Sequence, residues 1–214
     1  YNYYDRLSTS DQNDILMRVE HEVFLFDSTG NKSILELPFK TNNLTGYNYI
    51  KQFGKTNLLV RILNTSQIPR HHLSLDDGKS WKEIGRDTKL GLDIVYSIQP
   101  LSDGTLIGYK QEDVLTSTDN GNSWDISPKR WNKKNYNAPF IDSKENIHVI
   151  GIDSGYISTD KCSTWLSYPI NSPSTNILWS SFIICDSLFI MNEQVNKVFF
   201  SRDHGLKWDS IIFK

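Results

Sequence analysis

The amino-acid sequence predicts an all-β protein, a β-propeller of five four-stranded antiparallel blades. Two observations predict this fold. An eight-residue motif, called here the octet, returns at a nearly constant period, and each period contains four segments with the composition of short strands. A period of about 40 to 45 residues that holds four strands is typical of a propeller blade.

The octet has the form S-x-D-x-G/C-x-x-W. Its copies are SLDDGKSW, STDNGNSW, STDKCSTW and SRDHGLKW, and successive octet serines are 43, 41 and 43 residues apart. One copy would be a weak signal, but four copies at this spacing define a repeat. The shared positions are Ser74, Asp76, Gly78 and Trp81; Ser117, Asp119, Gly121 and Trp124; Ser158, Asp160, Cys162 and Trp165; and Ser201, Asp203, Gly205 and Trp208.

The segments around each octet alternate apolar and polar residues, as half-buried strands do. In the third unit, DIVYSIQPLSD, GTLIGYK and DVLTSTD precede the octet tryptophan, whereas the first unit keeps its strand segments but lacks the octet Asp and Trp. We therefore expect a single propeller domain over residues 1–214. Its blades are expected at about 1–39, 40–86, 87–128, 129–170 and 171–214. Two outcomes fit this pattern: a closed five-bladed ring, or a part of a longer propeller.

Each octet is expected to clip the turn between the third and fourth strands of its blade. Asp and Ser side chains can accept hydrogen bonds from backbone N–H groups of a turn, and Gly adopts positive φ without strain. The tryptophan can then return into the fourth strand and bury its ring between blades. Four copies around a ring cannot all face one substrate, so the octets are expected to be structural rather than catalytic.

The four octets resemble the Asp-box, or BNR, repeat of sialidase-type propellers, and the resemblance covers the chain from Asp14 to Lys214. The same repeat occurs in other glycoside hydrolases, in sortilin-like receptor ectodomains and in many secreted proteins. The resemblance implies boxes at the rim, away from any catalytic centre, and an extracytoplasmic or secreted protein. Cys162 departs from the glycine of the motif, so its turn is expected to be strained or to adopt a different φ. A disulfide to Cys185 stays open, although the two positions are expected to lie too far apart for the ~5.5 Å Cα separation of a bridge.

Binding groups are expected at the sheet ends opposite the octets, because loops on a rigid scaffold carry function. Two connections stand out there, NTSQIPRHH (Asn64–His72) and SPKRWNKKNYN (Ser127–Asn137). An aromatic ring among cations suits stacking on a sugar or pairing with an acidic group. The alternative is that Trp131 packs on its own blade and the lysines are solvated. The candidate binding residues are Arg130, Trp131, Lys133, Lys134, Tyr136, Arg61, Arg70 and His71.

Several classes of function lack support in the sequence. The net charge of −2 does not attract nucleic acid, and no apolar run reaches the roughly 20 residues of a membrane helix. The five histidines show no metal-ligand spacing, so no metal and no cofactor is expected. No catalytic residue is assigned. The F/Y-R-I-P string of sialidases is missing, and Arg18 and Arg61, at matching places in adjacent units, either point to the ring axis or lie between blades.

The sequence therefore predicts a non-catalytic module that binds a glycan or a protein surface through loops opposite the octets. The alternative is a glycoside hydrolase of the sialidase-like type, or a fragment of one. A third class is a purely structural or assembly-factor propeller. Nothing in the sequence predicts the oligomeric state.

Overall fold

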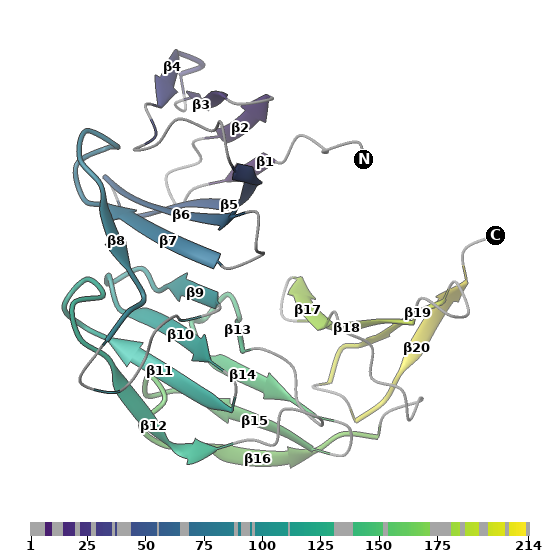
Figure 1. Cartoon of the computed structure of the whole chain (residues 1–214). Helices are drawn as coiled ribbons and strands as arrows, with labels where there is room; N and C mark the ends of the chain where they lie inside the picture. The colour runs from purple at the N-terminus through teal and green to yellow at the C-terminus, as the bar shows by residue number, and fades with distance from the viewer. Residues whose placement is uncertain are drawn as a thin grey trace. The chain divides into compact units, whose positions relative to one another are not determined.

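The chain forms twenty β-strands in five antiparallel sheets of four strands each (Figure 1). This confirms the predicted all-β fold and its four-stranded units. The structure is a computed structural model, and it describes residues 7–9, 15–19, 22–26, 29–35, 37, 44–54, 56–64, 69–87, 90, 95, 97–110, 112–130, 139–151, 154–171, 181–184, 187–192, 197–203 and 206–212.

Each sheet is made of strands that follow one another along the chain. The first sheet contains β1 (Leu7–Thr9), β2 (Ile15–Val19), β3 (Glu22–Phe26) and β4 (Lys32–Leu35). The second contains β5 (Leu44–Phe53), β6 (Asn57–Asn64), β7 (Pro69–Ser74) and β8 (Lys82–Ile84). The third contains β9 (Ser97–Pro100), β10 (Leu106–Lys110), β11 (Asp113–Ser117) and β12 (Asp125–Arg130).

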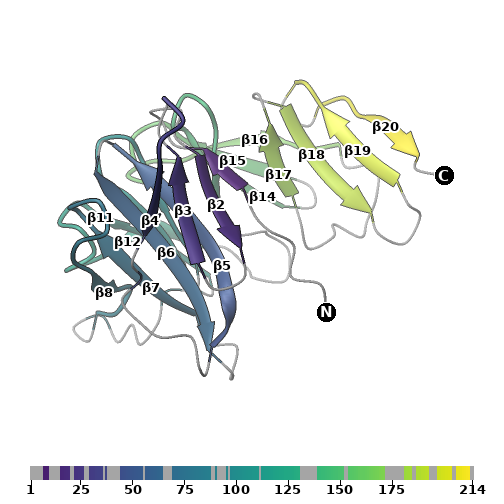
Figure 2. The same ribbon diagram turned by 90° about the horizontal axis from the view of Figure 1, so that it is seen from above.

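The last two sheets repeat this order. The fourth contains β13 (Phe140–Ile141), β14 (Ile147–Ile150), β15 (Ser154–Ser158) and β16 (Leu166–Pro169). The fifth contains β17 (Ser181–Ile184), β18 (Ser187–Asn192), β19 (Lys197–Ser201) and β20 (Asp209–Ile212). Figure 2 shows β17 to β20 side by side in chain order, which is the arrangement of an up-and-down meander.

The chain divides into two compact units. The first comprises residues 1–108 and 117–124, and the second comprises residues 109–116 and 125–214. The first unit therefore holds the first two sheets and the first two octets. The second unit holds the last two sheets with the remaining octets.

Burial is greatest in the middle strands of the sheets. Leu58, Leu59 and Val60 of β6 are fully buried, and all four residues of β14 are buried. The fourth strands are much more open: every residue of β20 is exposed, and Leu166 of β16 is 69% exposed. In the second, third and fourth sheets the apolar core thus lies over the second and third strands, and the fourth strand forms one edge of each sheet.

Two connections begin or end differently from the sequence-based expectation. Residues 69–72, expected in the connection Asn64–His72, belong to strand β7, because the hairpin with β6 continues through the pairs Leu63↔Pro69 and Ile62↔Arg70. Proline is tolerated there because it is the first residue of its strand. Likewise, residues 127–130, expected in the connection Ser127–Asn137, belong to strand β12. In both sheets the strand pairing thus extends into a segment that the turn-forming residues of the sequence placed in a connection.

In the described ranges, no helix has the length and apolarity needed to span a bilayer.

Candidate functional site

Three arginines gather at one end of the second sheet. Arg70 lies near the start of β7, which runs toward its octet, and Arg86 follows β8, which runs away from it. Arg61 lies in β6 directly opposite His71 in the ladder. These residues, with His72 and Glu83, are called the basic cluster. It lies toward the sheet end opposite the octet, where binding groups were expected.

The basic cluster spans both faces of the sheet. His72 pairs with Glu83, whereas His71 pairs with Arg61 and Ile84, so neighbouring strand residues point to opposite faces. A Cβ added to Gly85 would lie 3.7 Å from Nδ1 of His71 and 3.1 Å from the side chain of Ile98. His71 is therefore enclosed by the next sheet, with 1% of its surface exposed, and lies beside Arg61 on the same face of the sheet.

The exposed part of the basic cluster is held by Glu83. Its carboxylate Oε1 accepts a hydrogen bond from Nε of Arg86 at 3.0 Å, and its Oε2 lies 3.9 Å from Nη1 of Arg70. The side chains of Arg70 and Arg86 are about half exposed, at 49% and 51%. One carboxylate does not neutralise two guanidinium groups, so this edge keeps positive charge that is open to solvent.

Both histidines of the basic cluster are neutral at neutral pH. Burial, followed by the charges of Arg61 and His72, lowers the pKa of His71 to about 3. Burial also lowers the pKa of His72; the Glu83 carboxylate acts in the opposite direction, and Arg70 lowers this pKa further. The cluster therefore presents guanidinium groups as its fixed cations, and guanidinium pairs well with carboxylate, sulfate or phosphate groups.

The structure describes only part of the second set of candidates. Arg130 is the last residue of β12 and lies opposite Asp113 in the ladder. Trp131, Lys133, Lys134 and Tyr136 lie outside the described residues. The structure thus places Arg61, Arg70 and His71 in neighbouring strands of one sheet, and the binding role of all the candidates stays a prediction.

The octets are closed hydrogen-bonded turns. In each octet the serine hydroxyl donates to Oδ1 of the aspartate, at 2.8 Å for Ser74 and 2.9 Å for Ser117. In the first three octets the serine oxygen also accepts the backbone N–H of the fifth octet residue, at 2.8 Å from Gly78, 2.9 Å from Gly121 and 2.9 Å from Cys162. Gly78 and Gly121 have φ of +80° and +75°, which explains why glycine occupies the fifth position.

The octet carboxylates accept hydrogen bonds from their own turns, on both oxygens in the first three octets and on Oδ1 in the fourth. Oδ1 of Asp119 accepts the backbone N–H of Ser123 at 2.9 Å, and Oδ2 accepts its hydroxyl at 2.7 Å. The hydrogen bonds from Ser123 lower the pKa of Asp119 to about 2, and those from Ser80 do the same for Asp76. The pKa values of the other two octet aspartates are also lowered by turn hydrogen bonds, led by Thr164 for Asp160 and by Lys207 for Asp203.

Replacing Asp119 by alanine should destabilise the protein, because two bonds from Ser123 and one from Ser117 are lost. We expect a decrease of about 1 to 2 kcal/mol in the free energy of unfolding, similar to the loss of a helix cap. Denaturant unfolding measures it. The matched control is Asp125→Ala, which removes an exposed carboxylate from the adjacent strand. Equal unfolding midpoints for the two variants would contradict the role of Asp119 in stabilising the octet turn.

The fifth octet position lies against the preceding sheet. A Cβ added to Gly78 would come within 2.4 Å of Leu35, and one added to Gly121 within 2.9 Å of Ile84. Ile84 and Ser127 each follow their own octet tryptophan by three residues. The third octet therefore meets a serine where the second meets an isoleucine.

Ser127, which is smaller than the isoleucine at the matching place, explains how a cysteine replaces glycine in the third octet. Cys162 adopts φ of +70° and is 2% exposed, so its turn keeps the conformation of the glycine octets at the expense of backbone strain. Ser127 donates to the Cys162 carbonyl at 3.1 Å and accepts the indole N–H of Trp165 at 2.9 Å. Cys162 is a free thiol whose pKa burial raises to about 12, and Cys185, the other cysteine of the chain, lies outside the described residues.

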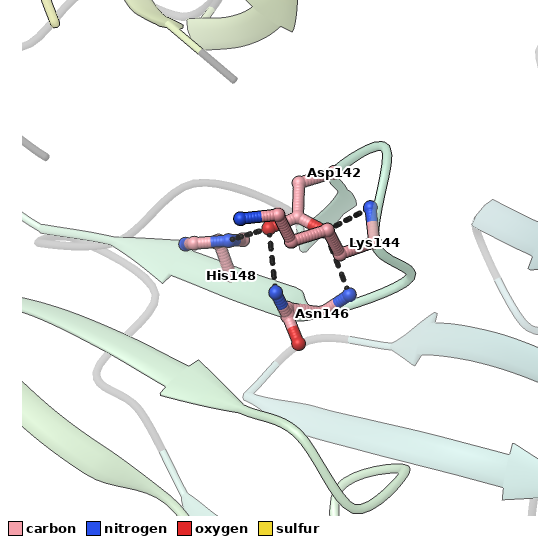
Figure 3. A network of polar contacts seen from close by, with 4 residues as sticks. All are labelled: Asp142, Lys144, Asn146 and His148. Atoms are coloured by element: carbon pink, nitrogen blue, oxygen red, sulfur yellow. Dashed lines mark hydrogen bonds and ion pairs between the residues drawn. The ribbon is translucent and has the colours of Figure 1, made fainter. Parts of the chain in front are cut away.

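A buried Asp–His pair in the fourth sheet was not found by sequence reasoning. Oδ2 of Asp142 lies 3.0 Å from Nε2 of His148 and accepts the side-chain amide of Asn146 at 2.8 Å (Figure 3). Its Oδ1 accepts the backbone N–H groups of Lys144 and Asn146 at 2.9 and 2.8 Å. The His148 ring stacks on Phe140 with centroids 5.3 Å apart.

The Asp–His pair is built into a hairpin rather than open to a substrate. The side chains of Asp142 and His148 are only 7% and 2% exposed. Burial alone would raise the pKa of Asp142, but hydrogen bonds from His148 and Asn146 outweigh it, and the pKa is lowered. The sequence signal for this pair was an aspartate at a turn followed by a histidine an even number of residues later. The pair clamps the turn between β13 and β14.

No group of three or more metal-ligating side chains occurs in the part of the chain that the structure describes.

Comparison with solved structures finds propeller proteins at low sequence identity. Virginiamycin B lyase from Staphylococcus aureus is 12% identical with a TM-score of 0.59, covering 97% of this chain and 69% of that one. YCF48 bound to D1 peptide is 12% identical with a TM-score of 0.57, covering 96% and 66%. The GH74 enzyme of Niastella koreensis is 14% identical with a TM-score of 0.55, covering 92% and 35%.

No model of a known protein family matches the chain, and no curated protein matches it. The solved structures carry different functions at identities that establish fold alone. Together with the five four-stranded sheets, they show that the chain has a β-propeller fold.

Proposed function

We propose that the chain is a non-catalytic binding module that recognises a glycan or a protein surface through the sheet ends opposite the octets. The basic cluster carries this proposal. Arg70 and Arg86 are half exposed around the single carboxylate of Glu83, and Arg61 lies behind them in β6. Since the planar guanidinium group binds pairs of anionic oxygens through two parallel hydrogen bonds, the favoured ligand feature is a carboxylate, sulfate or phosphate group.

Engagement of the carboxylates supports binding over hydrolysis. Glycoside hydrolases use two carboxyl groups about 5 to 10 Å apart that are free to meet the substrate. The octet aspartates and Asp142 instead accept hydrogen bonds from their own turns. A glycoside hydrolase, the activity class in the name of one similar structure, is the alternative.

We also propose a relationship to the Asp-box propellers, together with an extracytoplasmic location. The support is the hydrogen-bond set that the octets share, in which a serine and an aspartate close each turn. A propeller of similar fold has been solved with a bound peptide, which shows that this architecture can recognise a polypeptide.

Replacing Arg70 and Arg86 together by alanine should weaken ligand binding by about tenfold or more, because the exposed guanidinium groups are lost. The measurement is binding of the purified chain to arrays of neutral and acidic glycans and of neutral and acidic peptides. The matched control is Arg202→Ala. Arg202 belongs to the fourth octet, and its guanidinium group packs on the ring of Phe200. We expect this control to bind like the wild type.

Three results would decide against the proposal. Binding that is equal in the double variant and in the wild type would remove the basic cluster from the function. Absence of acidic ligands among those bound would do the same. Turnover of fluorogenic glycosides that Arg61→Ala abolishes would favour the hydrolase.

A further inference from the structure

A groove lies between the first sheet and the octet of the second sheet, both within the first unit. The groove is open to solvent and has a volume of about 350 Å³. This volume is at the small end of the roughly 300 to 1,000 Å³ typical of ligand pockets. Its lining comes from the end of β4 and from the first octet: Ile34, Leu35, Leu37, Asp77, Gly78, Lys79 and Trp81.

The floor of the groove is apolar. Leu35 is 7% exposed and packs with Leu58, while Leu37 and Trp81 pack against this pair. Leu35 approaches the octet closely because Gly78 has no side chain there. Ile34 stands at the side of the groove with 60% of its surface exposed. A ligand that covers Ile34 would gain from removing this apolar surface from water.

The Trp81 ring is oriented by the octet. Its indole N–H donates to the carbonyl of Gly78 at 3.0 Å. Because that hydrogen-bond donor is already used, the ring offers a ligand its apolar surface. By contrast, Trp124 in the second octet is 3% exposed and has no ring surface left to offer.

The rim of the groove carries one acceptor and one donor. Asp77 and Lys79 are both exposed and flank Gly78. A carboxylate can accept a peptide N–H, and an ammonium group can donate to a peptide carbonyl. A sugar would also meet these two groups, but its other hydroxyls would face Ile34, Leu35 and Leu37, which cannot hydrogen-bond to them.

The position of β4 also favours a polypeptide. This strand is the last in the order β1-β2-β3-β4 and so forms the sheet edge beside the groove. Extended segments of partner proteins bind along such edges and place alternate side chains into adjacent pockets. The pattern of one apolar pocket, a carboxylate and an ammonium group fits one residue of such a segment.

We propose that this groove binds a large aliphatic or aromatic side chain of an extended segment of a partner polypeptide, with Asp77 and Lys79 bonding its peptide groups. The groove adjoins an octet, whereas the basic cluster lies toward the opposite end of the sheet. The inference therefore goes beyond the proposed function and does not depend on it.

Selection of phage-displayed random peptides on the purified full chain tests the proposal, followed by fluorescence anisotropy with the selected peptides. We expect the selected sequences to share one large apolar residue. Ile34→Asp should weaken their binding by about tenfold or more, because a charge would then face the apolar side chain. Lys79→Ala should weaken it several-fold.

The control is Leu166→Asp, which places the same charge at an exposed aliphatic residue on the fourth strand of another sheet. This variant should bind like the wild type, and circular dichroism should show that all variants are folded. Failure to select peptides, or equal binding by Ile34→Asp and Leu166→Asp, overturns the proposal. Binding of glycans that depends on Ile34 would overturn it in favour of a sugar site. Selected peptides whose binding Ile34→Asp weakens report on the groove, whereas peptides whose binding depends on Arg70 and Arg86 report on the basic cluster, so the two proposals are tested separately.

Discussion

Replacing Gly121 by alanine should destabilise the protein by about 2 to 5 kcal/mol. Part of this loss is backbone strain, roughly 1 to 2 kcal/mol for an L-residue at positive φ. The rest is crowding, about 1 to 3 kcal/mol, because the new Cβ would lie 2.9 to 3.2 Å from three atoms of Ile84. The unfolding midpoint in urea, together with its slope, measures the change.

A glycine elsewhere in the chain separates the two contributions. Gly104 has φ of +89°, and a Cβ added there would meet nothing within 4 Å. Gly104→Ala should therefore show backbone strain alone. If both alanine variants lose the same stability, packing between the sheets is not what requires glycine in the octet.

The third octet supplies the reciprocal experiment. Ser127→Ile should destabilise the protein, because isoleucine would crowd Cys162 and remove the hydrogen bonds at 3.1 and 2.9 Å. Adding Cys162→Gly should recover part of the loss, giving a coupling free energy of about 0.5 to 3 kcal/mol. Additive effects of the two substitutions would argue against a packed pair.

Stability should fall as the pH decreases from about 6.5 towards 3, and His71 should account for much of this change. The pKa of folded His71 is about 3, below the ordinary value of 6.5. Between these pH values the unfolded chain binds a proton at His71 that the folded chain does not bind, so protonation favours unfolding. The full effect is on the order of 5 kcal/mol, at about 1.4 kcal/mol for each pKa unit.

His71→Leu should remove most of the pH dependence between about 6.5 and 4, because leucine fills a similar volume and does not titrate. The measurement is the free energy of unfolding as a function of pH. The octet carboxylates act in a lower window: with folded pKa values of about 2, Asp76 and Asp119 stabilise the protein above about 4, and this stabilisation is lost as the pH falls towards 2. Asp119→Ala should therefore lower the stability by a constant amount above about pH 4 and change the slope of the curve only below that pH. An unchanged slope between pH 6.5 and 4 in His71→Leu would contradict the buried, neutral histidine.

Much of the candidate site was visible in the sequence, but its geometry was not. Arg61, Arg70 and His71 could be placed near one connection because strand order follows chain order in a meander. Their division between two sheet faces depends on the register of β6 with β7, which in turn depends on where the turn begins. The Asp142–His148 pair escaped notice for a similar reason, since alternation along one short hairpin brings the two side chains together.

The sequence by itself determined the fold class, the number of sheets and the turn role of the octets. It could do so because the octets, their period and the alternation of apolar residues are local patterns that repeat. Only the tertiary structure decided why Cys162 is tolerated, how deeply His71, His72 and His148 are buried, and where the groove beside Trp81 lies. Each of these depends on the volume and charge that a neighbouring sheet brings to a residue, and such contacts join positions about 35 to 45 residues apart that no local pattern connects.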